Sequence, residues 1–110
     1  MLGAIPAAMR TAAGMTADLA ARDPALRVSL HSLSSIEIAR RLDVFELDAG
    51  ITYLDNEPLR GVQAVPVTME RFVLAQASWV ARAGEPVSWA EAAELPLALL
   101  TPDMQNRRIV

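Results

Sequence analysis

The sequence predicts an α/β protein with a parallel sheet, and three observations support that prediction. Residues 27–54 read as strand, loop, capped helix and strand, which is the order of a βαβ unit. A further strand and helix of the same kind precede them at 1–22. The segment 48–54 is mostly apolar, as expected for a strand that is covered on both faces. Strand, helix and strand at this spacing form a βαβ unit, whose crossover is almost always right-handed.

The first predicted strand is the short apolar run 1–5, which ends at Pro6. Proline suits a loop or the first position of a helix and is disfavoured inside a strand. The helix that follows should begin at Ala7 and end at Arg22. Small and apolar residues share one of its faces at helical spacing: Ala8, Ala12, Met15 and Leu19. Pro24 cannot continue this helix, so it ends before Asp23–Pro24.

The central unit begins with residues 27–31, which alternate polar and apolar side chains and place Val28 and Leu30 on one face. The segment from Ser34 to Glu37 fits a capping box, in which serine and glutamate satisfy each other's backbone amides. The helix that starts there should end near Leu47. A pair between Glu37 and Arg41 is expected on its outer face, four residues apart.

The helix and strand periodicities converge on one predicted core. An apolar stripe of the central helix supplies three members at i, i+4 and i+7 spacing, and the strands supply the rest. The predicted members are Ile5, Val28, Leu30, Ile38, Leu42, Phe45, Ile51 and Tyr53.

The remaining segments are predicted from shorter patterns. Turn-forming residues predict a surface loop at 55–61, followed by strands at 62–67 and 69–77 and a loop at 78–86. Ser88 to Glu91 is a second capping box, opening a helix to about Glu94. The run 95–100 reads as a buried strand. Thr101, Pro102 and Asp103 signal the start of a helix from Met104. Because this helix would stop after about two turns, we expect the sequence to be a fragment of a longer chain.

Composition narrows the class of protein. The chain has 110 residues, of which 53% are hydrophobic, enough for one small domain or part of a larger one. Its net charge is −3, so it lacks the basic surplus of a surface that binds phosphate backbones. It has no cysteine, which excludes disulfides, thiolate metal sites and a cysteine nucleophile. We expect neither a membrane span nor a signal peptide.

No catalytic set assembles in the sequence. The single histidine, His31, lies on a predicted strand without a partner motif and is interpreted as a partly exposed strand residue. The carboxylates Asp43, Glu46 and Asp48 are interpreted as a solvated helix end. No dinucleotide, phosphate-loop or metalloprotease motif occurs. The sequence therefore predicts a protein that is not an enzyme and that binds no metal and no cofactor.

Three predicted helices start directly after a strand, at Pro6, Ser34 and Thr101. In open α/β sheets these starts lie at the carboxyl ends of the strands, where ligands bind. Helix starts present free amides and a positive partial charge, so they favour a small anion. The hydroxyls of Ser32, Ser34, Ser35 and Thr101 lie near these starts, and Tyr53 ends a strand at the same rim. Two alternatives stay open: Ser34 as an ordinary cap satisfied internally, and Tyr53 as a wall of the core.

The residues resemble one family in their order and spacing. LGAIPAAM, LRVSL, SLSSIEIARRLDVFELDAGITYL, ERFVLA and VSWAEAAELPLALLTPDMQNRRIV are similar to the effector-binding domain of LysR-type transcriptional regulators. The resemblance implies a periplasmic-binding-protein-like (type 2) fold of two α/β lobes. Residues 1–74 would form most of the first lobe, and 75–110 the truncated start of the second. The implied effector cleft is lined by Pro6, Ala7, Ser32, Ser34, Ser35, Tyr53 and Thr101.

The resemblance also implies partners. The expected function is that of the sensory region of a cytoplasmic transcription regulator, which binds a small anionic metabolite. DNA would be bound only through a helix-turn-helix domain outside this sequence. Homo-oligomers would form through the helix between Ala7 and Arg22 and the helix that starts at Met104. The alternative is a solute-binding domain of the same fold that serves transport.

Overall fold

The computed structural model describes residues 1–54, 61–77, 84–102 and 104–109. The chain divides into two compact units, and each is described by itself. The first unit contains Met1–Pro66 together with Leu100–Val110, and the second contains Val67–Leu99. The predicted division into lobes at residue 74 stays a prediction.

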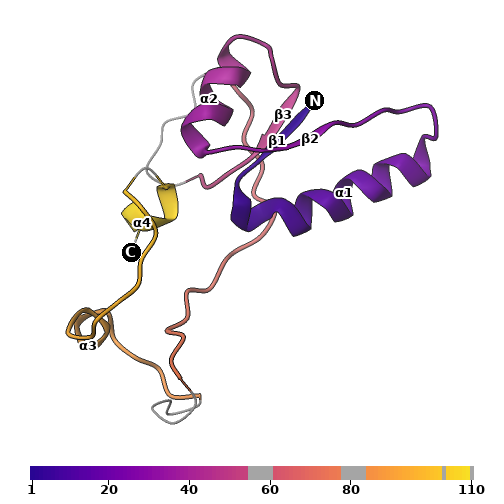
Figure 1. Ribbon diagram of the computed structural model, residues 1–110. Helices are drawn as coiled ribbons and strands as arrows, with labels where there is room; N and C mark the ends of the chain where they lie inside the picture. The colour runs from indigo at the N-terminus through magenta and orange to yellow at the C-terminus, as the bar shows by residue number, and fades with distance from the viewer. Residues whose placement is uncertain (55–60, 78–83, 103, 110) are drawn as a thin grey trace. The chain divides into compact units, whose positions relative to one another are not determined.

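The first unit is built on a parallel sheet of three short strands (Figure 1). The strands are β1 (Leu2–Ala4), β2 (Leu30–Ser32) and β3 (Ala49–Ile51). β1 lies in the centre, so the strand order is β2-β1-β3. Gly3 of β1 is in register with His31 on one side and with Gly50 on the other. The predicted α/β class with a parallel sheet is confirmed.

The helices of this unit follow β1 and β2. A 3-10 turn, η1 (Pro6–Ala8), leads from β1 into α1 (Met9–Arg22), and α2 (Ser35–Asp43) follows β2. The connection from β1 to β2 and the connection from β2 to β3 run in opposite directions across the sheet. With right-handed crossovers, α1 and α2 therefore lie on opposite faces, as Figure 1 shows.

The core lies between α2 and the sheet. It consists of Ile5, Ile38 and Leu47, and its partly buried neighbours are Ala8, Leu33, Leu42 and Tyr53. Glycines in the sheet let the helix approach closely, since a Cβ atom at Gly50 would lie 2.4 Å from Cγ2 of Ile38. Ile38 is completely buried as a result. The predicted core positions of Ile5, Ile38, Leu42 and Tyr53 are confirmed, whereas Val28, Leu30 and Ile51 are half-buried outside this cluster.

Phe45 was predicted to be a core residue, and that prediction is wrong. Its side chain is 93% exposed, because α2 ends at Asp43 and its stripe does not reach residue 45. The amide of Phe45 donates to the carbonyl of Leu42 and that of Glu46 to the carbonyl of Arg41, as in a Schellman motif. Phe45 occupies its left-handed position with φ 57°, which glycine usually fills. Leu47, two residues later, fills the core instead.

The second unit contains one helix, α3 (Trp89–Ala93), among its described residues. The predicted capping box at its start is confirmed, with the Ser88 hydroxyl accepting from the Glu91 amide at 3.2 Å. Phe72 packs edge-on against Trp89 with ring centroids 6.1 Å apart. Ala92 is buried, whereas Met69 and Val73 are largely exposed.

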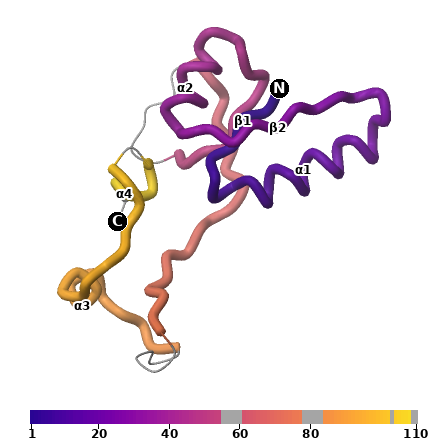
Figure 2. The backbone as a smooth tube through the Cα atoms, in the orientation of Figure 1, coloured from indigo at the N-terminus to yellow at the C-terminus, as the bar shows by residue number. Residues whose placement is uncertain are grey.

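The strands predicted at 62–67, 69–77 and 95–100 are wrong. The described residues in these ranges have no strand structure, and their backbone runs as irregular chain (Figure 2). A strand persists only where a neighbour pairs with its amides and carbonyls. The described part of the chain offers these segments no such neighbour, so apolar composition alone did not make them strands.

Two predicted loops and one helix signal fall partly outside the described residues. The positions outside the described residues are 55–60 of the first loop, 78–83 of the second loop and Asp103 of the helix signal. The predicted helix after Thr101 is present as α4 (Gln105–Ile109), which belongs to the first unit.

Candidate functional site

A pocket of about 120 Å³ lies in the first unit at the carboxyl ends of the strands. Its described lining combines apolar residues with neutral polar ones. The lining residues are Ile5, Pro6, Ala7, Ser34, Ser35, Tyr53, Leu100, Met104, Gln105 and Asn106. They come from the segments that follow β1, β2 and β3 and from the region around α4. Ligands bind at this kind of position in open α/β sheets, where the strand order reverses.

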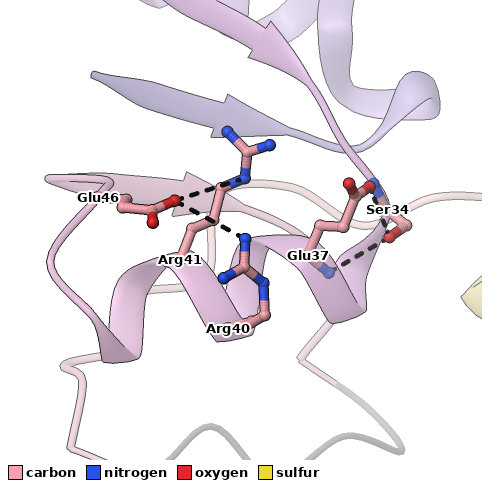
Figure 3. A network of polar contacts seen from close by, with 5 residues as sticks. All are labelled: Ser34, Glu37, Arg40, Arg41 and Glu46. Atoms are coloured by element: carbon pink, nitrogen blue, oxygen red, sulfur yellow. Dashed lines mark hydrogen bonds and ion pairs between the residues drawn. The ribbon is translucent and has the colours of Figure 1, made fainter.

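The start of α2 forms one wall of this pocket, and its cap is satisfied internally (Figure 3). The Ser34 hydroxyl accepts from the Glu37 amide at 3.3 Å and donates to Glu37 Oε2 at 3.0 Å. The Ser34 amide donates to the same carboxylate oxygen at 3.1 Å. The predicted capping box is confirmed, and the alternative of an internally satisfied cap therefore holds for Ser34.

Ser35 differs from its neighbour because it has no internal partner. The residue is 3% exposed, it lines the pocket, and its Oγ forms no hydrogen bond within the structure. Buried hydroxyls are normally hydrogen-bonded, so the Ser35 hydroxyl has hydrogen-bonding capacity to offer at the pocket wall. The amides of Ser35 and Ile36 also lack intrahelical acceptors, since they belong to the first turn of α2.

The charged side chains on and just after α2 are not all paired with one another. Hydrogen bonds from the backbone and side chain of Ser34 lower the pKa of Glu37, with smaller contributions from Arg41 and Arg40. The predicted pair between Glu37 and Arg41 is not formed. Arg40 Nη2 and Arg41 Nε lie 3.7 and 4.0 Å from Glu46 Oε2 instead. Figure 3 marks both contacts with dashed lines. Glu37 is thus ionised and held by Ser34 rather than by an arginine.

Gln105 is a pocket residue that the sequence did not reveal. It opens α4, is 4% exposed, and accepts a hydrogen bond from the Thr52 hydroxyl to its Oε1 at 3.3 Å. This contact joins α4 to the segment after β3. The helix-start signal at Thr101 and Pro102 pointed to this region, but no sequence period distinguishes a buried glutamine from an exposed one.

The structure brings together five of the seven predicted site residues. Pro6, Ala7, Ser34, Ser35 and Tyr53 line the pocket. Tyr53 also packs against the core, as one of its two interpretations expects, and a ligand-binding role for the lining residues stays a prediction. Ser32 and Thr101 are exposed and do not line the pocket, so a role for them stays a prediction.

In the part of the chain that the structure describes, the other titratable and metal-binding groups form no second cluster. His31 lies half-buried in β2, as interpreted from the sequence, and its Nε2 forms no hydrogen bond. Within the described ranges, no three His, Cys, Asp or Glu side chains are grouped to hold a metal ion. In the same ranges, every helix is too short or too polar to cross a membrane. The predicted lack of catalysis and of a cofactor stays a prediction.

Comparison with known proteins identifies the family. A model of the LysR substrate binding domain matches residues 1–110, the whole length of the chain. Searches of curated proteins and of solved structures returned no match. Domains of this family are regulatory ligand-binding domains with a periplasmic-binding-protein-like type 2 fold. The parallel α/β sheet and the pocket at its strand ends agree with that match. The chain therefore belongs to the LysR substrate binding domain family.

Proposed function

We propose that this chain senses a small anionic metabolite, most simply a carboxylate, in the pocket at the start of α2, and thereby controls transcription. The observation that carries the proposal is the buried, unpaired Ser35 Oγ at the pocket wall. Two free amides lie beside this hydroxyl, and the helix supplies a positive partial charge. Together they form a set of donors suited to a carboxylate.

The remaining lining fits the body of such a ligand. Ile5, Leu100 and Met104 offer apolar contacts, and Tyr53 and Gln105 add polar groups. A cavity of about 120 Å³ accommodates a compact organic acid rather than a large one. Ser32 and Thr101 are proposed to contribute hydroxyls when the ligand extends beyond the described lining.

Titration of the purified protein with acetate, lactate and benzoate tests this proposal, with ¹⁵N amide shifts as the readout. Binding should shift the Ser35 and Ile36 amides first. Ser35→Ala should weaken binding about ten- to a hundredfold, because a hydrogen bond to a charged ligand contributes about 1.5–3 kcal/mol. Ser29→Ala is the matched control, since this serine is exposed and lies outside the lining.

The result contradicts the proposal if no carboxylate shifts these amides while the protein is folded. Ser32→Ala and Thr101→Val, measured in the same way, test the two predicted contacts that do not line the pocket.

The proposal includes the partners of the wider regulator. DNA would be bound through a helix-turn-helix domain outside this sequence, in the cytoplasm, and the protein would form homo-oligomers through α1 and α4. Met15 and Leu19 support a contact through α1, because both are exposed apolar residues on this helix. Leu19→Asp should lower the mass measured by analytical ultracentrifugation. An unchanged mass, or a monomeric parent protein, would reject that surface.

A further inference from the structure

The described residues of the pocket lining carry no charged side chain, yet one carboxylate is hydrogen-bonded to a lining residue. All ten lining residues are apolar or neutral and polar. Ser34, one of them, is hydrogen-bonded through both its amide and its hydroxyl to Glu37 Oε2. The charge nearest along the chain to the free amides of Ser35 and Ile36 is therefore that of Glu37.

Hydrogen bonds hold this solvent-exposed carboxylate at the start of α2. Its oxygen accepts two hydrogen bonds from Ser34, and the Glu37 amide donates to the Ser34 hydroxyl in return. Figure 3 shows the side chain turned back toward Ser34, along the start of α2. The carboxylate cannot swing away from the helix start without giving up these bonds.

Among the residues that the structure describes, this carboxylate forms no ion pair. Arg40 and Arg41 follow Glu37 on the same helix, but their guanidinium groups lie toward Glu46. Ser34 lowers the pKa of Glu37, so the group is ionised at neutral pH. A ligand at the Ser35 and Ile36 amides would lie within about one helical turn, roughly 5 Å, of this negative charge.

We propose that Glu37 is a specificity-determining residue of the pocket, which admits neutral or singly charged ligands and disfavours doubly charged ones. The inference rests on the proposed function, because it concerns the ligand of the same site. The first negatively charged group of a ligand accepts hydrogen bonds from the helix amides and the Ser35 hydroxyl. A second charge meets no lysine, arginine or histidine among the described lining residues and is repelled by Glu37.

Three small tetrahedral probes of similar size separate charge from shape: dimethyl sulfone, methanesulfonate and sulfate, which are neutral, singly and doubly charged. Their dissociation constants are measured at low ionic strength from the amide shifts of Ser35 and Ile36. Glu37→Gln removes the charge and keeps a side chain that can complete a capping box. It should strengthen methanesulfonate binding about threefold and sulfate binding about tenfold, because Coulomb energy doubles with ligand charge. Dimethyl sulfone binding should not change.

The chain offers a matched control in its second capping box. Glu91 caps Ser88 in the same geometry but does not line the pocket. Glu91→Gln changes the net charge equally and should leave all three affinities unchanged. Glu37→Asp keeps the charge on a shorter side chain and should retain the low affinity for sulfate, which separates charge from the loss of the original side chain.

The outcomes distinguish this inference from the proposed function. If neither acetate nor any probe shifts the Ser35 and Ile36 amides, the proposed site is wrong. If ligands bind but Glu37→Gln leaves the preference between sulfate and methanesulfonate unchanged, the role of Glu37 is wrong while the site stands. An equal gain in Glu91→Gln would also overturn it, because the effect would then come from net charge.

Discussion

The two capping boxes of this chain are nearly identical in local geometry and differ in what surrounds them. Ser34 and Glu37 open the nine-residue α2, and Ser88 and Glu91 open the five-residue α3. The stripe of α2 packs on a parallel sheet and buries Ile38 completely, whereas the buried residue of α3 is Ala92. The same local signal thus starts both helices, but only the one packed on a sheet supports a core and a pocket wall.

The strongest test of this comparison removes the contact between helix and sheet. Ile38→Ala should lower the free energy of unfolding by about 2–5 kcal/mol, because Ile38 is fully buried against the sheet. Val73→Ala in the second unit should change it by less than about 0.5 kcal/mol, because that side chain is 79% exposed. Urea denaturation followed by circular dichroism measures both. If Ile38→Ala leaves too little stability to measure, Ile38→Val should cost about 0.5–1.5 kcal/mol.

Removing the caps compares the two helices directly. Ser34→Ala should destabilise the protein by about 1 kcal/mol, because α2 loses its cap and belongs to the core. Ser88→Ala removes the same bonds from a short, exposed helix and should have a smaller effect on global unfolding. Amide hydrogen exchange in each helix is the complementary measurement. Equal losses of global stability would show that α3 unfolds together with the sheet.

The far end of α2 gives a third test, in which a substitution should stabilise the protein. Phe45 holds a left-handed conformation that is unfavourable for any residue with a Cβ atom, and it is almost fully exposed. Phe45→Gly should raise the free energy of unfolding by about 1 kcal/mol. Phe45→Ala is the control, since it removes the exposed ring but keeps the backbone strain. A stabilisation by alanine as large as that by glycine would attribute the effect to the ring.

The smallest expected effect is the pH dependence of the stability that the two capping boxes contribute. Ser34 and Ser88 lower the pKa values of Glu37 and Glu91 below the ordinary value of 4.5. A lowered folded-state pKa contributes stability that is fully present above 4.5 and is lost as the pH falls through the folded-state value. Acid titration of helical circular dichroism should show this loss. In Glu37→Gln the part that comes from α2 should be absent, and an unchanged titration would contradict the assignment to Glu37.

Local sequence patterns were enough to predict the order of strands and helices in the first unit. Alternation at 27–31, the capping box at Ser34 and the apolar run before Pro6 indicated the order of strands and helices, and so the rim where the pocket lies. What the sequence could not indicate depends on distant partners. The apolar runs near 62–77 and 95–100 resemble strands, yet a strand also needs a neighbouring strand, which a local pattern does not reveal.

The errors at single residues have the same origin. Phe45 fits the helical stripe by spacing, but α2 ends two residues before it, and end positions are the least certain part of a pattern. Leu47 replaced it because the chain turns back toward β3. The buried Gln105 accepts a hydrogen bond from Thr52, which lies more than fifty residues away in sequence. Ser35 was found because helix starts are marked locally, although its lack of a partner was visible only in the structure.

The close contact between Gly50 and Ile38 has a mechanical consequence for ligand binding. A methyl group at position 50 would lie 2.4 Å from Cγ2 of Ile38, so a larger residue there would push α2 away from the sheet. Because packed interiors transmit strain, a helix lifted at Ile38 would carry Ser34 and Ser35 with it. A residue of the sheet that is not among the described lining residues thereby sets the position of the pocket wall. Gly50 thus keeps β3 and α2 close together, and Gly50→Ala would move the wall of the proposed binding pocket.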